Sequence, residues 1–215
     1  MLSCVSINDQ NKTSIVLSNP NANQEKFYDD LFKKNKLKEI EKERNGLKDY
    51  VAEMSKNERL SVLKEAKFAQ DDLEIRIRKQ SAWWKTRLFI LKKVDDKWSA
   101  EYQKQVFYDG TKKLKSVSKR KLNEPESGWE IFWQKIADEQ LLKLSDGLEN
   151  NGNDPCPDCG DYLIETKTAE NYSIYVYTTP SSQSELYEAR QISKISNIIA
   201  EEFKLNEFNT ETSVE

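Results

Sequence analysis

The chain has 215 residues, of which 37% are hydrophobic and 33% are charged, so its length suits one domain with an extension outside the core. The formal net charge of −3 creates no overall field that would attract nucleic acid or anionic lipid. The sequence contains no histidine, which excludes any Ser-His or Cys-His nucleophile pair within the chain.

Residues 1–22 are polar and rich in Asn and Ser, and they predict a flexible leader or tether. Leu2-Ser3-Cys4 resembles the end of a bacterial lipoprotein signal, in which the cysteine receives the lipid. One interpretation is therefore membrane association through a lipidated Cys4, and the other is a cytoplasmic chain in which Cys4 is incidental. No stretch of the sequence approaches the roughly 20 apolar residues that a membrane-spanning helix needs.

Residues 23–70 are expected to form a charged helical extension. Apolar residues recur at helical spacing near both ends of residues 24–54, and the Lys- and Glu-rich stretch between them is typical of a solvated helix face. Asn45-Gly46 predicts a break in this helix. Ser55 and Glu58 fit a capping box, which predicts that a second helix starts there.

Residues 71–205 are expected to form an α+β domain with an antiparallel sheet of about six strands in hairpins. Asp95-Asp96-Lys97 and Asp109-Gly110 predict turns that join neighbouring strands. The segments with strand patterns are residues 73–78, 87–94, 98–108, 111–119, 161–167 and 172–178.

Two amphipathic helices are expected to pack on one face of this sheet. The first has four large apolar residues at i, i+3, i+4 and i+7, which are Trp129, Phe132, Trp133 and Ile136. The second is the last helix, whose apolar stripe runs from Leu186 to Phe203. Residues 206–215 are expected to form a disordered acidic tail.

Three sequence elements follow one another in the last third of the chain. A Trp-rich helix begins with Trp129-Glu130-Ile131-Phe132-Trp133, a strand is entered through Gly160-Asp161-Tyr162-Leu163-Ile164-Glu165, and a Tyr-rich strand ends at Pro180. With the closing helix, residues 129–203 resemble a group of uncharacterised envelope proteins, many of them lipoproteins, from Bacteroidetes-like bacteria. The resemblance implies a fold and an envelope location, because the group has no established activity. Ser145 departs from the family pattern, in which a proline is usual.

Cys156 and Cys159 form the most conspicuous local motif. Their spacing matches half of a zinc-ribbon site, but a closed zinc site needs four ligands, and the sequence has neither a second Cys-x-x-Cys nor a histidine. The pair precedes a strand, so it lacks the helix N-terminus that commonly lowers the pKa of a redox thiol. We favour a loop disulfide in an exported protein over reduced thiols, and place zinc binding or redox catalysis third. No cofactor is expected.

Cationic residues cluster after the predicted turn at Asp109-Gly110. The cluster consists of Lys112, Lys113, Lys115, Lys119, Arg120 and Lys121. Such a cluster can bind phosphates, but lysines on an edge strand also prevent sheets from pairing with one another. With a net charge of −3, we favour the solvated edge strand over nucleic-acid binding.

These patterns favour a non-catalytic binding or structural protein with an unknown protein partner, lipid-anchored in a bacterial envelope. The second hypothesis is a cytoplasmic protein that binds another protein or nucleic acid. The third is an enzyme that uses carboxylates or the pair of Cys156 and Cys159. Asp161 and Glu165 are the carboxylates considered, because they share one face of a predicted strand, as acid and base in glycoside hydrolysis would require. No catalytic residue is assigned.

Overall fold

The computed structural model describes residues 20–82, 85–108, 113–144, 161–178 and 186–209, together with Pro180 and Ser184. The helices are α1 (Pro20–Asn57), α2 (Trp129–Asp138) and α3 (Tyr187–Phe203), and short 3-10 turns occur at η1 (Leu63–Glu65), η2 (Leu141–Lys143) and η3 (Asn206–Phe208). The strands are β1 (Leu73–Ala82), β2 (Lys85–Val94), β3 (Lys97–Phe107), β4 (Leu114–Leu122), β5 (Asp161–Thr168) and β6 (Tyr172–Thr178).

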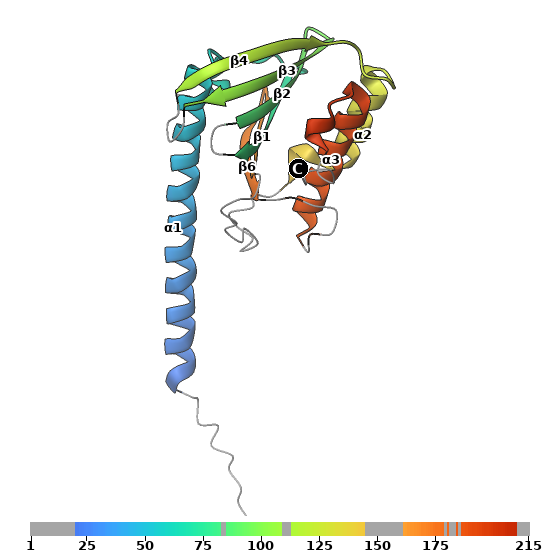
Figure 1. Ribbon diagram of the computed structural model, residues 1–215. Coiled ribbons are helices and arrows are strands. Elements are labelled where there is room, and N and C mark those ends of the chain that lie inside the picture. Colours follow the sequence, from blue (N-terminus) through green and yellow to red (C-terminus); the bar gives the residue numbers. More distant parts are fainter. Residues whose placement is uncertain are drawn as a thin grey trace, which may run out of the picture. The chain divides into compact units, whose positions relative to one another are not determined.

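The strands form one antiparallel six-stranded sheet in the order β4-β3-β2-β1-β5-β6, which confirms the predicted α+β class (Figure 1). The β2–β3 hairpin turns at Asp95 and Asp96, whose φ angles are 49° and 58°. Two consecutive residues with positive φ match the twist of the paired strands, as the sequence predicted here. The hairpin pairs Val94 with Lys97, and the register is unbroken from there to Lys85 and Val106.

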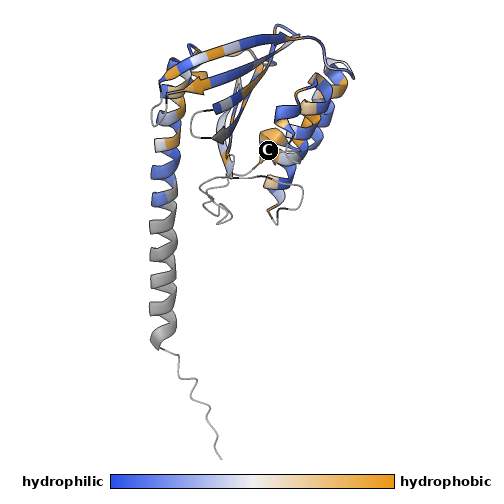
Figure 2. Cartoon of the chain, viewed as in Figure 1, coloured by the Kyte–Doolittle hydropathy of each residue, from blue (hydrophilic) through white to orange (hydrophobic). Residues whose placement is uncertain are grey.

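One face of the sheet, the core face, packs against α2 and α3. Hydrophobic and hydrophilic residues alternate along the strands (Figure 2), so that Ile75 and Ile77 of β1 point into this core. The aromatic stripe of α2 lies where it was predicted: Phe132 and Ile136 are buried, and Trp98 of β3 stacks on Trp129 with ring centres 6.3 Å apart. The core is made mainly by these strands and by Ile192, Ile195 and Ile199 of α3.

The opposite face of the sheet is also buried over part of its area. Val51 and Met54, near the end of α1, pack with Phe107, Leu163 and Ile174. The chain divides into two compact units, residues 1–41 and residues 42–215, so the last turns of α1 belong to the same unit as the sheet.

Two local predictions are wrong at the end of α1. The helix runs through Asn45-Gly46 without a break, and it ends at Asn57, so Ser55 and Glu58 do not start a new helix. Nothing lies within 4 Å of a Cβ placed on Gly46, which shows an open helix surface where glycine costs about 1 kcal/mol relative to alanine. Contacts of Val51 and Met54 with the sheet offset that cost.

The last described residues also differ from the expected tail. Asn206–Phe208 form η3, and the Phe208 ring is fully buried against Phe89 and Tyr102, with ring centres 6.2 and 5.8 Å away. Burying an aromatic ring of this size is enough to hold a short segment against the sheet.

Candidate functional site

Three cationic side chains lie side by side across the sheet. Lys79 of β1 is directly opposite Arg87 of β2, and Arg87 is directly opposite Lys104 of β3. All three are two residues along their strands from Ile77, Phe89 and Tyr102, which belong to the core, so they share the core face. We call Lys79, Arg87 and Lys104 the cationic row.

Like charges in directly opposite positions destabilise a sheet, so the cationic row needs negative partners. Lys79 is only 7% exposed, and its Nζ donates a hydrogen bond to the Asn209 backbone oxygen at 2.9 Å. Burial lowers the pKa of Lys79, and the nearby positive charge of Arg87 lowers it further. The folded protein therefore holds this ammonium group at a cost, because one neutral carbonyl oxygen does not balance its charge.

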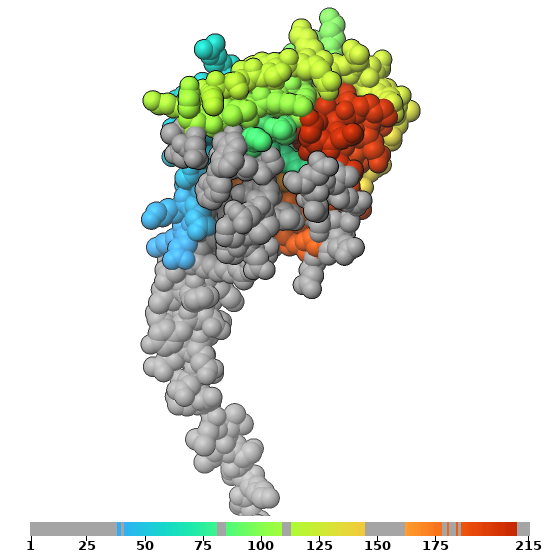
Figure 3. Space-filling view, in the orientation of Figure 1, coloured from blue at the N-terminus to red at the C-terminus, as the bar shows by residue number. Residues whose placement is uncertain are grey.

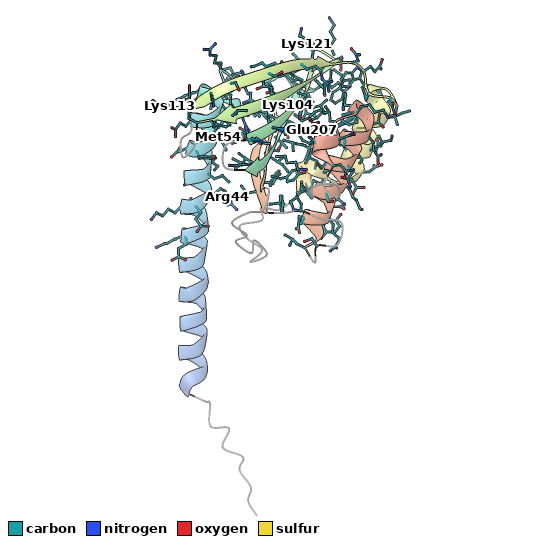
Figure 4. All side chains as sticks on the ribbon, in the orientation of Figure 1. Arg44, Met54, Lys104, Lys113, Lys121 and Glu207 are labelled. Atoms are coloured by element: carbon teal, nitrogen blue, oxygen red, sulfur yellow. The ribbon has the colours of Figure 1, made fainter. Side chains whose placement is uncertain are left out.

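A pocket of about 320 Å³ opens beside the row. It is lined by Tyr102, Lys104, Ser118, Arg120, Lys204 and Glu207, and we call it the cationic pocket. The first four residues come from β3 and β4, while Lys204 is the left-handed cap of α3 (φ 54°) and Glu207 belongs to η3. Figure 3 shows the surface where β4 borders the C-terminal helix, and Figure 4 shows Lys104 and Glu207 beside each other.

Glu207 is the only carboxylate among these six lining residues. It forms an ion pair with Lys104. Partial burial would raise the pKa of Glu207, but the hydrogen bond from Lys104 and the positive charge of Arg87 hold it below its usual range. Glu207 therefore carries a full negative charge at neutral pH, and it faces more cations than it can neutralise.

Two buried donors next to the pocket lack an acceptor among the described residues. Within the part of the chain that the structure describes, neither the Tyr102 hydroxyl nor the Arg87 Nε–H has a hydrogen-bond partner. Tyr102 is 3% exposed, and burial, followed by the charge of Glu207, raises the pKa of its hydroxyl to about 12. The hydroxyl is therefore a protonated donor at neutral pH, and leaving it unpaired costs about 1–3 kcal/mol.

A neighbouring pocket has a different charge balance. It shares Arg120 and Lys204 with the cationic pocket, but its lining includes three carboxylates, Glu124, Glu126 and Glu202. Glu126 pairs with Lys204 at 2.8 Å. The positive charge of this second pocket is therefore neutralised by the protein itself.

A second group of buried charges lies on the opposite face of the sheet and is balanced. Arg78 is 1% exposed and pairs with Glu58 at 2.9 Å and with Glu165 at 2.5 Å. Beside it, Arg76 pairs with Glu74 at 2.7 Å, and its Nη1 donates to the Ser61 backbone oxygen at 2.9 Å. These contacts tie the end of α1 to β1 and β5, so we assign the network a structural role.

Of the two carboxylates considered from the sequence as an acid and base, only the Glu165 side chain is described. Glu165 is held by Arg78, and it also accepts a hydrogen bond from the Tyr172 hydroxyl at 3.0 Å. Burial raises the pKa of Tyr172, and the charge of Glu165 raises it further, so this tyrosine stays a donor. The Asp161 side chain lies outside the described residues.

The residues of the basic cluster predicted from sequence lie on both faces of β4. β4 is an edge strand, and its residues are largely exposed. Arg120 is opposite Tyr102 on the core face, whereas Lys119 and Lys121 are opposite Gln103 and Glu101 on the other face. Lys115 stands over the Tyr108 ring, and Figure 4 shows Lys113 and Lys121 toward opposite ends of β4. Only Arg120 of this cluster lines the cationic pocket, and Lys112 lies outside the described residues.

The three cysteines, Cys4, Cys156 and Cys159, lie outside the described residues, so lipidation, a disulfide and a zinc site stay predictions. Among the residues that are described, no group of three or more His, Cys, Asp or Glu side chains is placed to hold a metal ion. No helix in that part of the chain is both long and apolar enough to span a membrane.

Sequence analysis missed the cationic row, Lys204 and Glu207. One signal was present: a tight turn at Asp95 and Asp96 fixes the β2–β3 register and thereby places Arg87 opposite Lys104. Lys204 and Glu207 lie at the site only because α3 and η3 pack on the sheet. No local sequence pattern predicts that packing. Comparisons of the chain with protein-family models, with curated proteins and with solved structures find no match.

Proposed function

We propose that this chain is a non-catalytic binding protein that holds its ligand in the cationic pocket. The observation that carries the proposal is the buried Tyr102 hydroxyl, which has no hydrogen-bond acceptor within the described residues although Tyr102 is one of the residues that line a pocket. Buried polar groups in folded proteins nearly always have a partner, and an exception beside a cavity is a reason to expect a ligand.

The ionisation of the lining residues supports binding over proton transfer. The pKa of Tyr102 is raised, so its hydroxyl keeps its proton, and the guanidinium of Arg120 is permanently charged. General acid–base catalysis works best with a group whose pKa lies near the operating pH. The lining residues are therefore suited to hold a ligand in place.

An anchor at the bacterial envelope is a separate proposal. Its support is the lipobox-like Leu2-Ser3-Cys4 and the resemblance of residues 129–203 to envelope proteins. The binding function does not depend on it.

The test is a thermal-shift screen of a metabolite library on three forms of the protein: wild type, Ser118→Trp and Ser116→Trp. Ser118 lines the pocket, whereas Ser116 lies two residues away on the same face of β4 and is exposed outside it. We expect at least one compound to raise the melting temperature of the wild type and of the Ser116→Trp control, but not of Ser118→Trp, whose indole fills the pocket. A screen without any such compound, or with shifts that survive Ser118→Trp, would refute the proposal.

A further inference from the structure

Positive charge exceeds negative charge around the cationic pocket. Lys104 and Arg120 line it from the sheet, and Arg87 lies directly opposite Lys104. Lys204 lines it from the end of α3 but is neutralised by Glu126. Glu207, the single carboxylate among the six described lining residues, leaves an excess of positive charge in a partly enclosed space. An anion would remove the repulsion between these cations.

Hydrogen-bond donors also outnumber acceptors around the pocket. Arg120 and Lys104 are donors in the lining, and two buried groups next to it, the Tyr102 hydroxyl and the Arg87 Nε–H, are donors without an acceptor among the described residues. A ligand rich in acceptor oxygens fits this set. Guanidinium groups hold phosphate and carboxylate through two parallel hydrogen bonds, and a phosphate offers more acceptor oxygens and more charge than a carboxylate does.

We infer that the cationic pocket binds a small organic phosphate, an inference that rests on the proposed binding function. The pocket, at about 320 Å³, has the size of a small-molecule site and is larger than a bare phosphate ion requires. The phosphate group lies between Arg120 and Lys104, and the organic part fills the space toward Lys204. Glu207 is a built-in competitor, because its carboxylate occupies Lys104 when no ligand is bound.

The test is isothermal titration calorimetry in a phosphate-free buffer at constant ionic strength. Glucose 6-phosphate is the probe, glucose is its neutral counterpart, and inorganic phosphate lacks the organic part. We expect glucose 6-phosphate to bind more tightly than inorganic phosphate, and glucose to give no heat of binding. Equal affinity for the two phosphates would overturn the organic part of the inference, and binding of glucose would overturn the role of the phosphate.

Two neighbouring residues of β4 give a matched pair of variants. Arg120→Gln and Lys119→Gln remove the same charge from the same exposed strand, but only Arg120 faces the pocket. We expect Arg120→Gln to weaken the binding of glucose 6-phosphate by about tenfold or more, and Lys119→Gln to change it by less than about twofold. If both variants weakened binding equally, the loss of net charge would explain the effect, and the assignment of the phosphate to this pocket would be refuted.

Glu207→Gln tests the competitor directly. It removes the carboxylate that holds Lys104, so we expect glucose 6-phosphate to bind several-fold more tightly. Unchanged or weaker binding would refute this role. The binding function and the phosphate ligand can be refuted separately. If Ser118→Trp blocks an uncharged ligand found in the thermal-shift screen while no phosphate binds, the pocket is a binding site but its ligand is not a phosphate.

Discussion

Arg78 is the residue whose replacement tests the structural network most sharply. It is 1% exposed and lies between two fully buried carboxylates, those of Glu58 and Glu165. Burial lowers the pKa of its guanidinium, but both carboxylates raise it more, so the charge is held firmly. Arg78→Met keeps most of the side-chain volume and removes the charge, which leaves both carboxylates buried without their shared partner.

Removing one partner of a buried ion pair costs about 3–5 kcal/mol. With a urea m-value of about 2 kcal/mol/M, this predicts that Arg78→Met lowers the unfolding midpoint by roughly 2 M without changing the m-value. The loss is a large share of the roughly 5–15 kcal/mol that stabilises a typical domain. The measurement is urea unfolding at neutral pH, followed by tryptophan fluorescence.

Two further variants separate burial from charge. Lys92→Met removes an exposed cation from the same network, where it pairs with Glu74 at 3.0 Å, and should cost less than about 1 kcal/mol. The triple replacement Glu58→Leu, Arg78→Met and Glu165→Leu should recover most of the stability, because no unpaired charge stays buried. A cost below about 1 kcal/mol for Arg78→Met alone, or a triple variant less stable than the single one, would refute the reasoning.

Three further predictions concern the core, α1 and the cationic pocket. Phe132→Ala should lower the free energy of unfolding by about 3–5 kcal/mol because Phe132 is fully buried, while the exposed Ile131→Ala should stay within about 0.5 kcal/mol, both by urea unfolding. Gly46→Ala should raise the free energy of unfolding by about 0.4–1 kcal/mol, because the added methyl group meets nothing within 4 Å. Lys104→Met should raise the pKa of Glu207, measured by carboxyl carbon NMR, because Lys104 now holds it low.

Each of these expectations has a contrary result. Equal losses for Phe132→Ala and Ile131→Ala would contradict the described packing of α2, and a destabilised Gly46→Ala would contradict an open helix surface. The low pKa of Glu207 stabilises the folded protein above the unfolded pKa, and that stability is lost as the pH falls through the folded pKa. The stability of Lys104→Met should therefore fall less than that of the wild type on acidification. An identical acid dependence would contradict the ion pair.

The hairpins and the Trp-bearing helix could be predicted because their signals are local. The alternation of Ile75 and Ile77 with Arg76 and Arg78 places the two kinds of side chain on opposite faces of β1, whatever surrounds the strand. The paired aspartates at the β2–β3 turn likewise act within a few residues.

The predictions near the end of α1 are wrong because the same residue pattern is compatible with two different structures. Ser55 and Glu58 have the spacing of a capping box, yet both are buried and directed at the arginines of β1. Gly46 is a weak helix breaker, and contacts of Val51 with the sheet outweigh it. Residues far away in the sequence decided both outcomes.

The sequence by itself determined that β1 has an apolar and a charged face, and that Arg87 and Lys104 belong to one hairpin. Only the tertiary structure decided that Arg78 is buried and balanced, and that Glu207 is the single carboxylate among the described residues that line the cationic pocket. Arg78 pairs with Glu58 and Glu165, which are 20 and 87 residues away from it in the sequence. A charge can be buried only where elements that are distant in the sequence place opposite charges next to it. The energy of such an ion pair depends on the distance between the two charges in the folded chain, and no local stretch of sequence specifies that distance.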